Sequence, residues 1–203
     1  MLDRAREKKF AYPAINVSSL TGANAGLKGP AESRSDGIIQ VSTGGAAFAS
    51  GASVKDMVLG AISIAEHVHR VADCYDIYVA LHTDHCQPTV LDSYVMPLID
   101  ETERRRAAGI SNLFNSHMFD GSAVTLKENL DMAVALLERC HKNEIILEIE
   151  VGVVGGEEDD VKAEGLISKL YTTLEDMLEA ARRLNTMKDA RYLWESSVAE
   201  RVK

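Results

Sequence analysis

The stretch LHTDHC at residues 81–86 places two imidazoles, a carboxylate and a thiol at the end of an apolar run. A neutral imidazole can bind zinc, and a neighbouring aspartate can hold a proton for a reacting oxygen atom. Asp84 and His85 would point to opposite faces of a regular strand, so both reach one site only if the strand ends near Asp84. Pro88 favours such an end. For any single imidazole the alternative is a hydrogen-bonded histidine of the core, and we prefer that interpretation for His82.

Two acidic segments further along the chain could also do chemistry. The segment EIILEIEVG at 144–152 places Glu148 and Glu150 two residues apart, so a strand would direct both carboxylates to one face. Because unpaired buried charge is costly, that face needs a metal ion or a solvated cavity, unless an edge strand exposes both glutamates to water. The segment GGEEDD at 155–160 is either a solvated acidic loop or a mobile loop that closes over a site and delivers a base.

Polar residues of these kinds end five separate apolar runs. They are Asn16, Ser42 with Thr43, Asp84 with His85, His117 with Asp120, and Glu148 with Glu150. Ligands of parallel α/β sheets bind outside the carboxyl ends of the strands, so these residues are expected to face one shared site. The segment STGG at 42–45 precedes a helix and could bind phosphate through backbone N–H groups, although it is not a Walker A sequence.

The elements that must position these residues alternate between strand and helix. Apolar or β-branched runs predict strands at 12–17, 37–42, 77–81, 113–119 and 144–151, and helical periodicity predicts helices at 53–75, 126–141 and 173–184. Ser53 is the expected N-cap of the first of these helices, and Thr173 with Asp176 has the spacing of a capping box. This order predicts an α/β fold in which crossover helices join parallel strands.

Two α/β layouts fit this pattern, an open doubly wound sheet and a closed (β/α)8 barrel. A complete barrel typically takes about 250 residues. The chain has 203 residues, so a barrel built from its five predicted strands would be incomplete.

The composition excludes several classes of protein. The chain is 46% hydrophobic and 26% charged, which is ordinary for a globular domain. Its formal net charge of -9 argues against general nucleic-acid binding, because phosphate contacts need clustered Lys and Arg. No apolar run approaches the roughly 18 residues of a membrane span, so none is expected. Three cysteines without a repeated spacing favour a reducing, cytoplasmic location.

Five motifs together resemble the class II, zinc-dependent fructose-bisphosphate aldolases. They are YPAINV at 12–17, SDGIIQVSTGGAAFASG at 35–51, VALHTDHC at 79–86, SHMFDGS at 116–122 and LEIEVGVVGGEED at 147–159. Their order and approximate spacing match the family over roughly residues 10–193. The resemblance implies a TIM (β/α)8-type barrel, of which about the first five β/α units are present as a single partial domain over residues 1–203.

The implied reaction is the reversible cleavage of fructose 1,6-bisphosphate into dihydroxyacetone phosphate and glyceraldehyde 3-phosphate, a carbon–carbon lyase step of glycolysis and gluconeogenesis. By this resemblance His85 is a catalytic zinc ligand, and the zinc polarises the ketone of the substrate. Asp84 would protonate or polarise the aldehyde oxygen. Glu158 would be the base that moves the proton on the dihydroxyacetone phosphate carbon.

The resemblance assigns four further residues. Asp120 and Glu150 match positions associated with a second divalent metal. Ser42 would contact glyceraldehyde 3-phosphate, and Asn16 would line the substrate pocket. The implied partner is therefore a phosphorylated sugar.

Motifs of the family's C-terminal half are not found in this sequence. They comprise two further zinc histidines, a glycine- and serine-rich phosphate loop, and an Asn-Val-Asp-type substrate segment. The segment WESSVAERVK at 194–203 is expected to be a divergent tail rather than the family's next strand. Because a partial barrel exposes strand edges and apolar helix faces, we expect a homodimer or pairing with a complementing chain.

Three functions stay open at this point. The first is an aldolase whose C-terminal half is missing through truncation or a shifted reading frame. The second is an inactive half-barrel that acts as an interaction or assembly partner. The third is a tagatose-bisphosphate aldolase relative that keeps the metal site but acts on the other sugar epimer.

Overall fold

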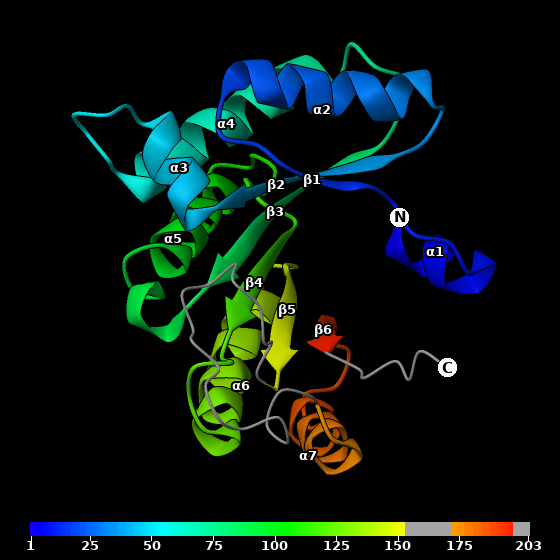
Figure 1. Ribbon diagram of the computed structural model, residues 1–203, viewed down its shortest axis with the longest axis vertical. Helices are drawn as coiled ribbons and strands as arrows, with labels where there is room; N and C mark the ends of the chain where they lie inside the picture. Colours follow the sequence, from blue (N-terminus) through cyan, green and yellow to red (C-terminus); the bar gives the residue numbers. More distant parts are fainter. Residues whose placement is uncertain (153–171, 197–203) are drawn as a thin grey trace, which may run out of the picture. The chain divides into compact units, whose positions relative to one another are not determined.

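The computed structural model describes residues 1–152 and 172–196, in which strands and helices alternate (Figure 1). The elements are α1 (Leu2–Lys8), β1 (Ala14–Asn16), α2 (Leu20–Glu32), β2 (Gly37–Ser42), α3 (Thr43–Ala49), α4 (Met57–Ala72), β3 (Val79–Cys86), the 3-10 turn η1 (Pro88–Val90), α5 (Val95–Ala107), β4 (Ser116–Asp120), α6 (Leu126–Lys142), β5 (Ile146–Val151), α7 (Leu174–Leu184) and β6 (Tyr192–Ser196). The predicted α/β class is confirmed.

The strands form one sheet in the order β1-β2-β3-β4-β5-β6, which is the order of the chain. The pairs β1–β2, β2–β3 and β5–β6 are parallel. Within the described residues the sheet is open, with β1 and β6 at its edges, as an incomplete barrel requires. The sequence predicted five strands, and the structure adds β6, whose residues 194–196 fall in the expected divergent tail.

The chain divides into two compact units, and each is described by itself. Unit 1 comprises residues 1–86 and 90–117, and unit 2 comprises residues 87–89 and 118–203. Residues 118–120 of β4 therefore belong to unit 2, whereas Ser116 and His117 belong to unit 1.

In unit 1, β2 presents two different faces. Ile39 and Val41 are buried, whereas Gln40 and Ser42 are half-buried on the opposite face. Ile39 packs against α2, where a Cβ added at Gly26 would lie 2.8 Å from the Ile39 Cδ1 atom. The helices thus cover the apolar face of β2 and leave its polar face for other contacts.

The helix α4 begins later than its sequence pattern suggested. Its N-cap is Asp56, whose carboxylate accepts a hydrogen bond from the Leu59 backbone N–H at 2.9 Å. The prediction that Ser53 is the cap was therefore wrong. The apolar spacing alone did not locate the first turn, because Gly51 and Lys55 both adopt positive φ and keep the preceding residues out of the helix.

In unit 2, two helices begin with capping boxes. Thr125 and Glu128 exchange hydrogen bonds at the start of α6. Thr173 and Asp176 do the same at the start of α7, which confirms the prediction and shows that the shorter Asp side chain suffices. A buried stripe on α6 contributes to the core of unit 2 and comprises Leu130, Ala133, Leu136, Leu137 and Cys140.

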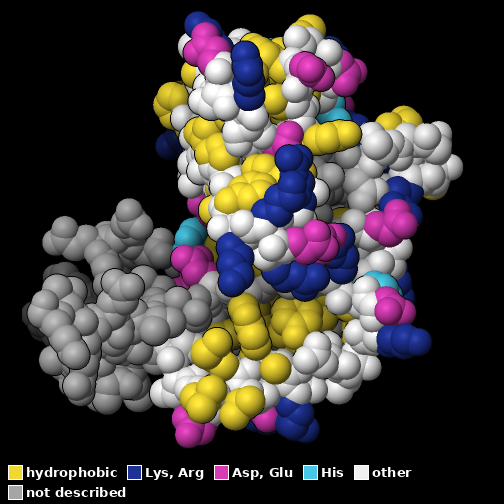
Figure 2. Space-filling model, turned by 90° about the vertical axis from the view of Figure 1, so that its right-hand side faces the viewer, with side chains coloured by type: hydrophobic (Ala, Val, Ile, Leu, Met, Phe, Trp, Pro, Cys, Tyr) yellow, Lys and Arg dark blue, Asp and Glu magenta, His cyan; other side chains and the backbone are white. Residues whose placement is uncertain are grey.

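The surface carries both charge signs and several exposed apolar side chains. Figure 2 shows one face on which basic and acidic side chains are interspersed and hydrophobic side chains lie between them. Among the described residues, the exposed large hydrophobic side chains are Phe10, Leu20, Phe48, Val54, Leu59, Tyr78, Ile110, Leu174 and Leu178. Among the described residues, no helix is both long and apolar enough to span a membrane.

Candidate active site

Asp84 is held by two side-chain amides from neighbouring strands of unit 1. Its Oδ2 accepts a hydrogen bond from Asn16 Nδ2 at 2.7 Å, and its Oδ1 accepts one from Gln40 Nε2 at 2.8 Å. The strand register explains the arrangement, because Asn16 pairs with Gln40 across β1 and β2. Two donors on two oxygens fix the orientation of the carboxylate. The structure thus brings together the predicted residues Asn16 and Asp84.

Gln40 was missed by the sequence analysis. Its signal was available, since Gln40 lies two residues before Ser42 and therefore shares its face of β2. Among the predicted residues of β2, only Ser42 at its end was named. Asp84 on β3 pairs in register with Ser42 on β2. The side chain of Gln40, two residues before Ser42 on the same face, is therefore close enough to bond to the Asp84 carboxylate.

His85 departs from regular strand geometry. The strand β3 ends at Cys86, two residues after Asp84 and close to the expected end. Within these last residues, His85 has φ of 36°, in the left-handed region that L-residues rarely adopt. Such a conformation costs of order 1–3 kcal/mol and occurs often at functional sites. This break interrupts the regular alternation of side chains along the strand. The side chains of Asp84 and His85 therefore need not point to opposite faces of the sheet.

His82 is a buried, hydrogen-bonded histidine, as preferred from the sequence. Its Nδ1 lies 2.7 Å from the Ser116 hydroxyl, a partner that the sequence analysis did not name. Burial lowers the pKa of His82 to about 4, so the ring is neutral near pH 7. This histidine therefore acts through hydrogen bonds rather than through charge.

His117 also belongs to the core of unit 1. It is fully buried, its Nδ1 lies 2.8 Å from the Thr83 hydroxyl, and its ring packs beside Phe114. Burial lowers the pKa of His117 to about 3. The expectation that His117 faces the shared site is not supported by these contacts, because its described neighbours are core side chains.

Ser42 ends β2 and caps the short helix α3. Its hydroxyl oxygen accepts a hydrogen bond from the Gly45 backbone N–H at 3.2 Å. The hydroxyl hydrogen is still able to donate to a ligand. The Gly45 N–H is occupied by this cap, which weakens the idea that STGG binds phosphate through its backbone.

Unit 2 contains a close pair of buried carboxylates. One carboxylate oxygen of Asp120 and one of Glu150 lie within 4.8 Å of each other. Asp120 and Glu150 are only 1% and 2% exposed. Asp120 Oδ1 also accepts hydrogen bonds from the Ser122 backbone N–H and hydroxyl. Two buried carboxylates at this separation repel each other unless a cation or hydrogen bonds offset the repulsion.

Glu148 and Glu150 do not lie on an edge strand. In the sheet, β5 lies between β4 and β6, so the alternative in which both glutamates face water from an edge was wrong. Glu148 is half-buried and Glu150 is buried. His85, Asp120 and Glu150 each offer a ligand atom of the kind that binds a divalent metal ion. Glu158 lies outside the described residues.

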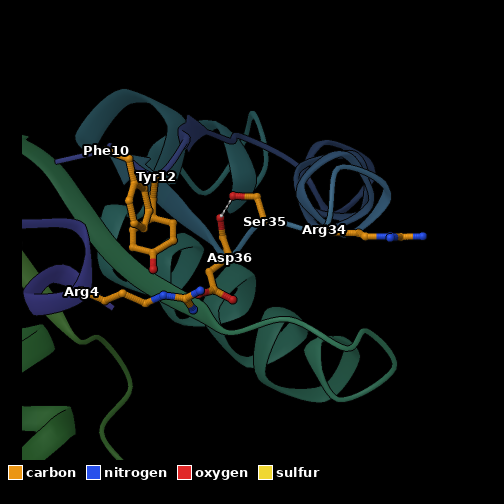
Figure 3. Close-up of a pocket in the computed structure, with 6 residues that line it drawn as sticks. All are labelled: Arg4, Phe10, Tyr12, Arg34, Ser35 and Asp36. Atoms are coloured by element: carbon orange, nitrogen blue, oxygen red, sulfur yellow. Dashed lines mark hydrogen bonds between the residues drawn. The ribbon is translucent and has the colours of Figure 1, made fainter. Parts of the chain in front are cut away.

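A separate pocket lies near the amino end of β2 in unit 1 (Figure 3). Its lining residues are Arg4, Phe10, Tyr12, Arg34, Ser35 and Asp36. The Asp36 carboxylate accepts a hydrogen bond from the Tyr78 backbone N–H, and the Arg34 side chain points away from the other five in Figure 3. None of the predicted site residues lines this pocket, which lies at the end of the strand opposite to Ser42.

Comparison with known proteins decides the family. The family model described as fructose-bisphosphate aldolase class-II matches residues 1–190. The chain belongs to this family.

Two relatives and one solved structure illustrate the similarity. The fructose-bisphosphate aldolase of Streptomyces coelicolor is 52% identical over 197 residues, which cover 97% of this chain and 57% of that protein. The one from Corynebacterium glutamicum is 53% identical over 193 residues, covering 95% and 56%. A crystal structure of the Campylobacter jejuni fructose-bisphosphate aldolase superposes with a TM-score of 0.84 at 38% identity, covering 96% and 55%.

The chain spans about half the length of the relatives that it matches. The aldolase resemblance on which the sequence analysis settled is thus confirmed for the family and for the N-terminal part of its members.

Proposed function

We propose that this chain supplies the N-terminal half of an aldolase active site that cleaves fructose 1,6-bisphosphate reversibly into dihydroxyacetone phosphate and glyceraldehyde 3-phosphate. The observation that carries the proposal is the clamp on Asp84, in which Asn16 and Gln40 hold both carboxylate oxygens. Family membership over residues 1–190 supports it, as does the similarity to the fructose-bisphosphate aldolase of Streptomyces coelicolor.

In this proposal Asp84 moves the proton at the aldehyde oxygen of the substrate. A proton donor must hold one orientation while the carbon–carbon bond breaks, and the two amides supply that orientation without adding charge. Asn16, which is exposed beside Asp84, lines the substrate pocket. Ser42 offers its hydroxyl hydrogen to the glyceraldehyde 3-phosphate portion.

His85 would hold the zinc ion that the family requires. His85 is a suitable residue for this role, because the imidazole ring is a preferred zinc ligand. The left-handed backbone at His85 also lets its side chain depart from the alternating directions of a regular strand. When bound, zinc supplies a Lewis acid that polarises the ketone oxygen of the substrate. Asp120 and Glu150 would hold a second divalent cation, because their buried carboxylates lie within 4.8 Å of each other.

The remaining parts of the proposal rest on the family resemblance. Glu158 would be the base that moves the proton on the dihydroxyacetone phosphate carbon. The chain would work in the cytoplasm as part of glycolysis, as a homodimer or with a complementing chain. Exposed apolar side chains such as Phe48 and Leu178 are compatible with such an association.

A reconstitution assay tests the proposed function. Residues 1–203 are joined to the C-terminal part of the Streptomyces coelicolor aldolase that the match does not cover, and fructose 1,6-bisphosphate cleavage is followed by coupled oxidation of NADH. We expect cleavage that EDTA abolishes and zinc restores. Tagatose 1,6-bisphosphate serves as the epimer control and should turn over more slowly. Absence of cleavage in a folded, zinc-loaded chimera would contradict the proposal.

A further inference from the structure

The side chain of Asn129 joins α6 to the last residues of β5. Asn129 is only 2% exposed, and its Nδ2 donates a hydrogen bond to the backbone carbonyl oxygen of Glu150 at 2.8 Å. The helix that carries Asn129 is fixed at its start by the capping box of Thr125 and Glu128. The amide therefore reaches the backbone of Glu150 from a rigid support.

The same amide packs against the residue that follows Asp120. A Cβ added at Gly121 would lie 2.2–2.4 Å from the Cγ, Oδ1 and Nδ2 atoms of Asn129. Any side chain at this position would displace the amide, so only glycine allows the approach. Asn129 thus contacts the chain directly after Asp120 and bonds to the backbone of Glu150.

The amide of Asn129 does more than fill space in the core. Leucine has nearly the same shape but could not donate a hydrogen bond to the Glu150 carbonyl oxygen. The Oδ1 atom of Asn129 has no hydrogen-bond partner among the described residues. The hydrogen bond to Glu150 is therefore the contact through which Asn129 can act on the carboxylate pair.

We propose that Asn129 is a positioning residue that sets the separation of the Asp120 and Glu150 carboxylates and thereby the affinity of this pair for a divalent cation. The inference rests on the second cation position of the proposed function. Repulsion between two buried carboxylates drives them apart unless the backbone holds them. The Asn129 amide provides that hold, because it contacts the backbone beside both residues.

Manganese binding by the whole chain tests the proposal. The N129L variant keeps the shape of the side chain and removes its hydrogen bond to Glu150. The matched control is N143L, because Asn143 is a buried asparagine at the other end of α6 that donates to the Arg139 carbonyl at 3.0 Å. Free Mn2+ is measured by electron paramagnetic resonance, and thermal unfolding is recorded in parallel.

We expect the Kd for Mn2+ to rise at least tenfold in N129L and to stay within twofold in N143L, although each variant loses one hydrogen bond and both should lose a similar amount of stability. If loss of stability alone weakened Mn2+ binding, the Kd would rise equally in both variants. Equal Kd values for N129L and the unaltered chain would overturn the inference.

A further comparison separates this inference from the proposed function. If the unaltered chain has no saturable Mn2+ site, the proposal of a second cation position is wrong. The role of Asn129 is then decided by amide hydrogen exchange at Gly121 and Val151. Exchange at least tenfold faster in N129L than in N143L supports the positioning role, and equal exchange rates overturn it.

Discussion

Replacing Asp84 by asparagine is expected to slow fructose 1,6-bisphosphate cleavage in the reconstituted chimera by roughly 10²- to 10⁴-fold, the usual contribution of a positioned general acid or base. Asparagine has the same shape and can still contact Asn16 and Gln40, but it cannot exchange a proton with the aldehyde oxygen. The loss should fall on kcat, because the proton moves during the chemical step. Steady-state kinetics on both proteins measures it.

The control for D84N is D92N, which alters an exposed aspartate of unit 1. D92N removes the same charge from the same unit, and its kcat should stay within about twofold of the unaltered chimera, because surface substitutions usually have small effects. If D84N retains most of the kcat, Asp84 is not the proton donor and the clamp on it has another purpose.

Replacing Gly60 by alanine is expected to destabilise the chain by about 3 kcal/mol, at the upper end for an overpacked core. The added Cβ would lie 1.8 Å from the Ala46 carbonyl oxygen and 3.0 Å from the Ser50 backbone N. These are backbone atoms of the α3 segment and cannot rotate away, so α3 and α4 must separate. Since α3 starts directly after Ser42, the end of β2 should loosen as well. Urea unfolding measures the change.

Gly29 provides the matched control. It lies exposed in α2 and a Cβ there would meet nothing within 4 Å. Alanine has the higher helix propensity, but a Cβ directly before Pro30 disfavours helical backbone, so the two effects oppose each other and G29A should change stability by no more than about 1 kcal/mol. An unfolding midpoint of G60A equal to that of the unaltered chain would show that α3 and α4 are less tightly packed than the structure indicates.

The fold could be predicted where local pattern and tertiary packing agree. The runs that became β2 and β5 and the periodicity of α6 located these elements to within a few residues. The strand β6 was missed because its apolar run, Tyr192–Trp194, is only three residues long and is followed by polar residues. Its conformation depends on parallel pairing with β5, in which Leu147 pairs with Tyr192. The partner strand of such a segment cannot be identified from the local sequence alone.

The site could be predicted in its residue types but not in its contacts. Asn16 and Asp84 were expected at strand ends, and a hydrogen bond joins them. Gln40 and Asn129 were missed because each is defined by a distant partner, Asp84 for the first and the Glu150 carbonyl for the second. The left-handed backbone of His85 was also missed, because no glycine marks the position and periodicity assumes a regular strand.

The zinc affinity of the H85A chimera tests most directly the claim that the end of β3 carries a metal ligand of the active site. The control is H67A, which removes another imidazole of unit 1, one that is bonded to the Asn24 side chain on a neighbouring helix. Zinc binding is measured by competition with a chelator. Since the loss of outer-shell partners alone weakens metal binding about 10- to 100-fold, H85A should bind zinc roughly 100-fold more weakly or worse, and H67A should bind it normally. Unchanged zinc affinity in H85A would contradict the account.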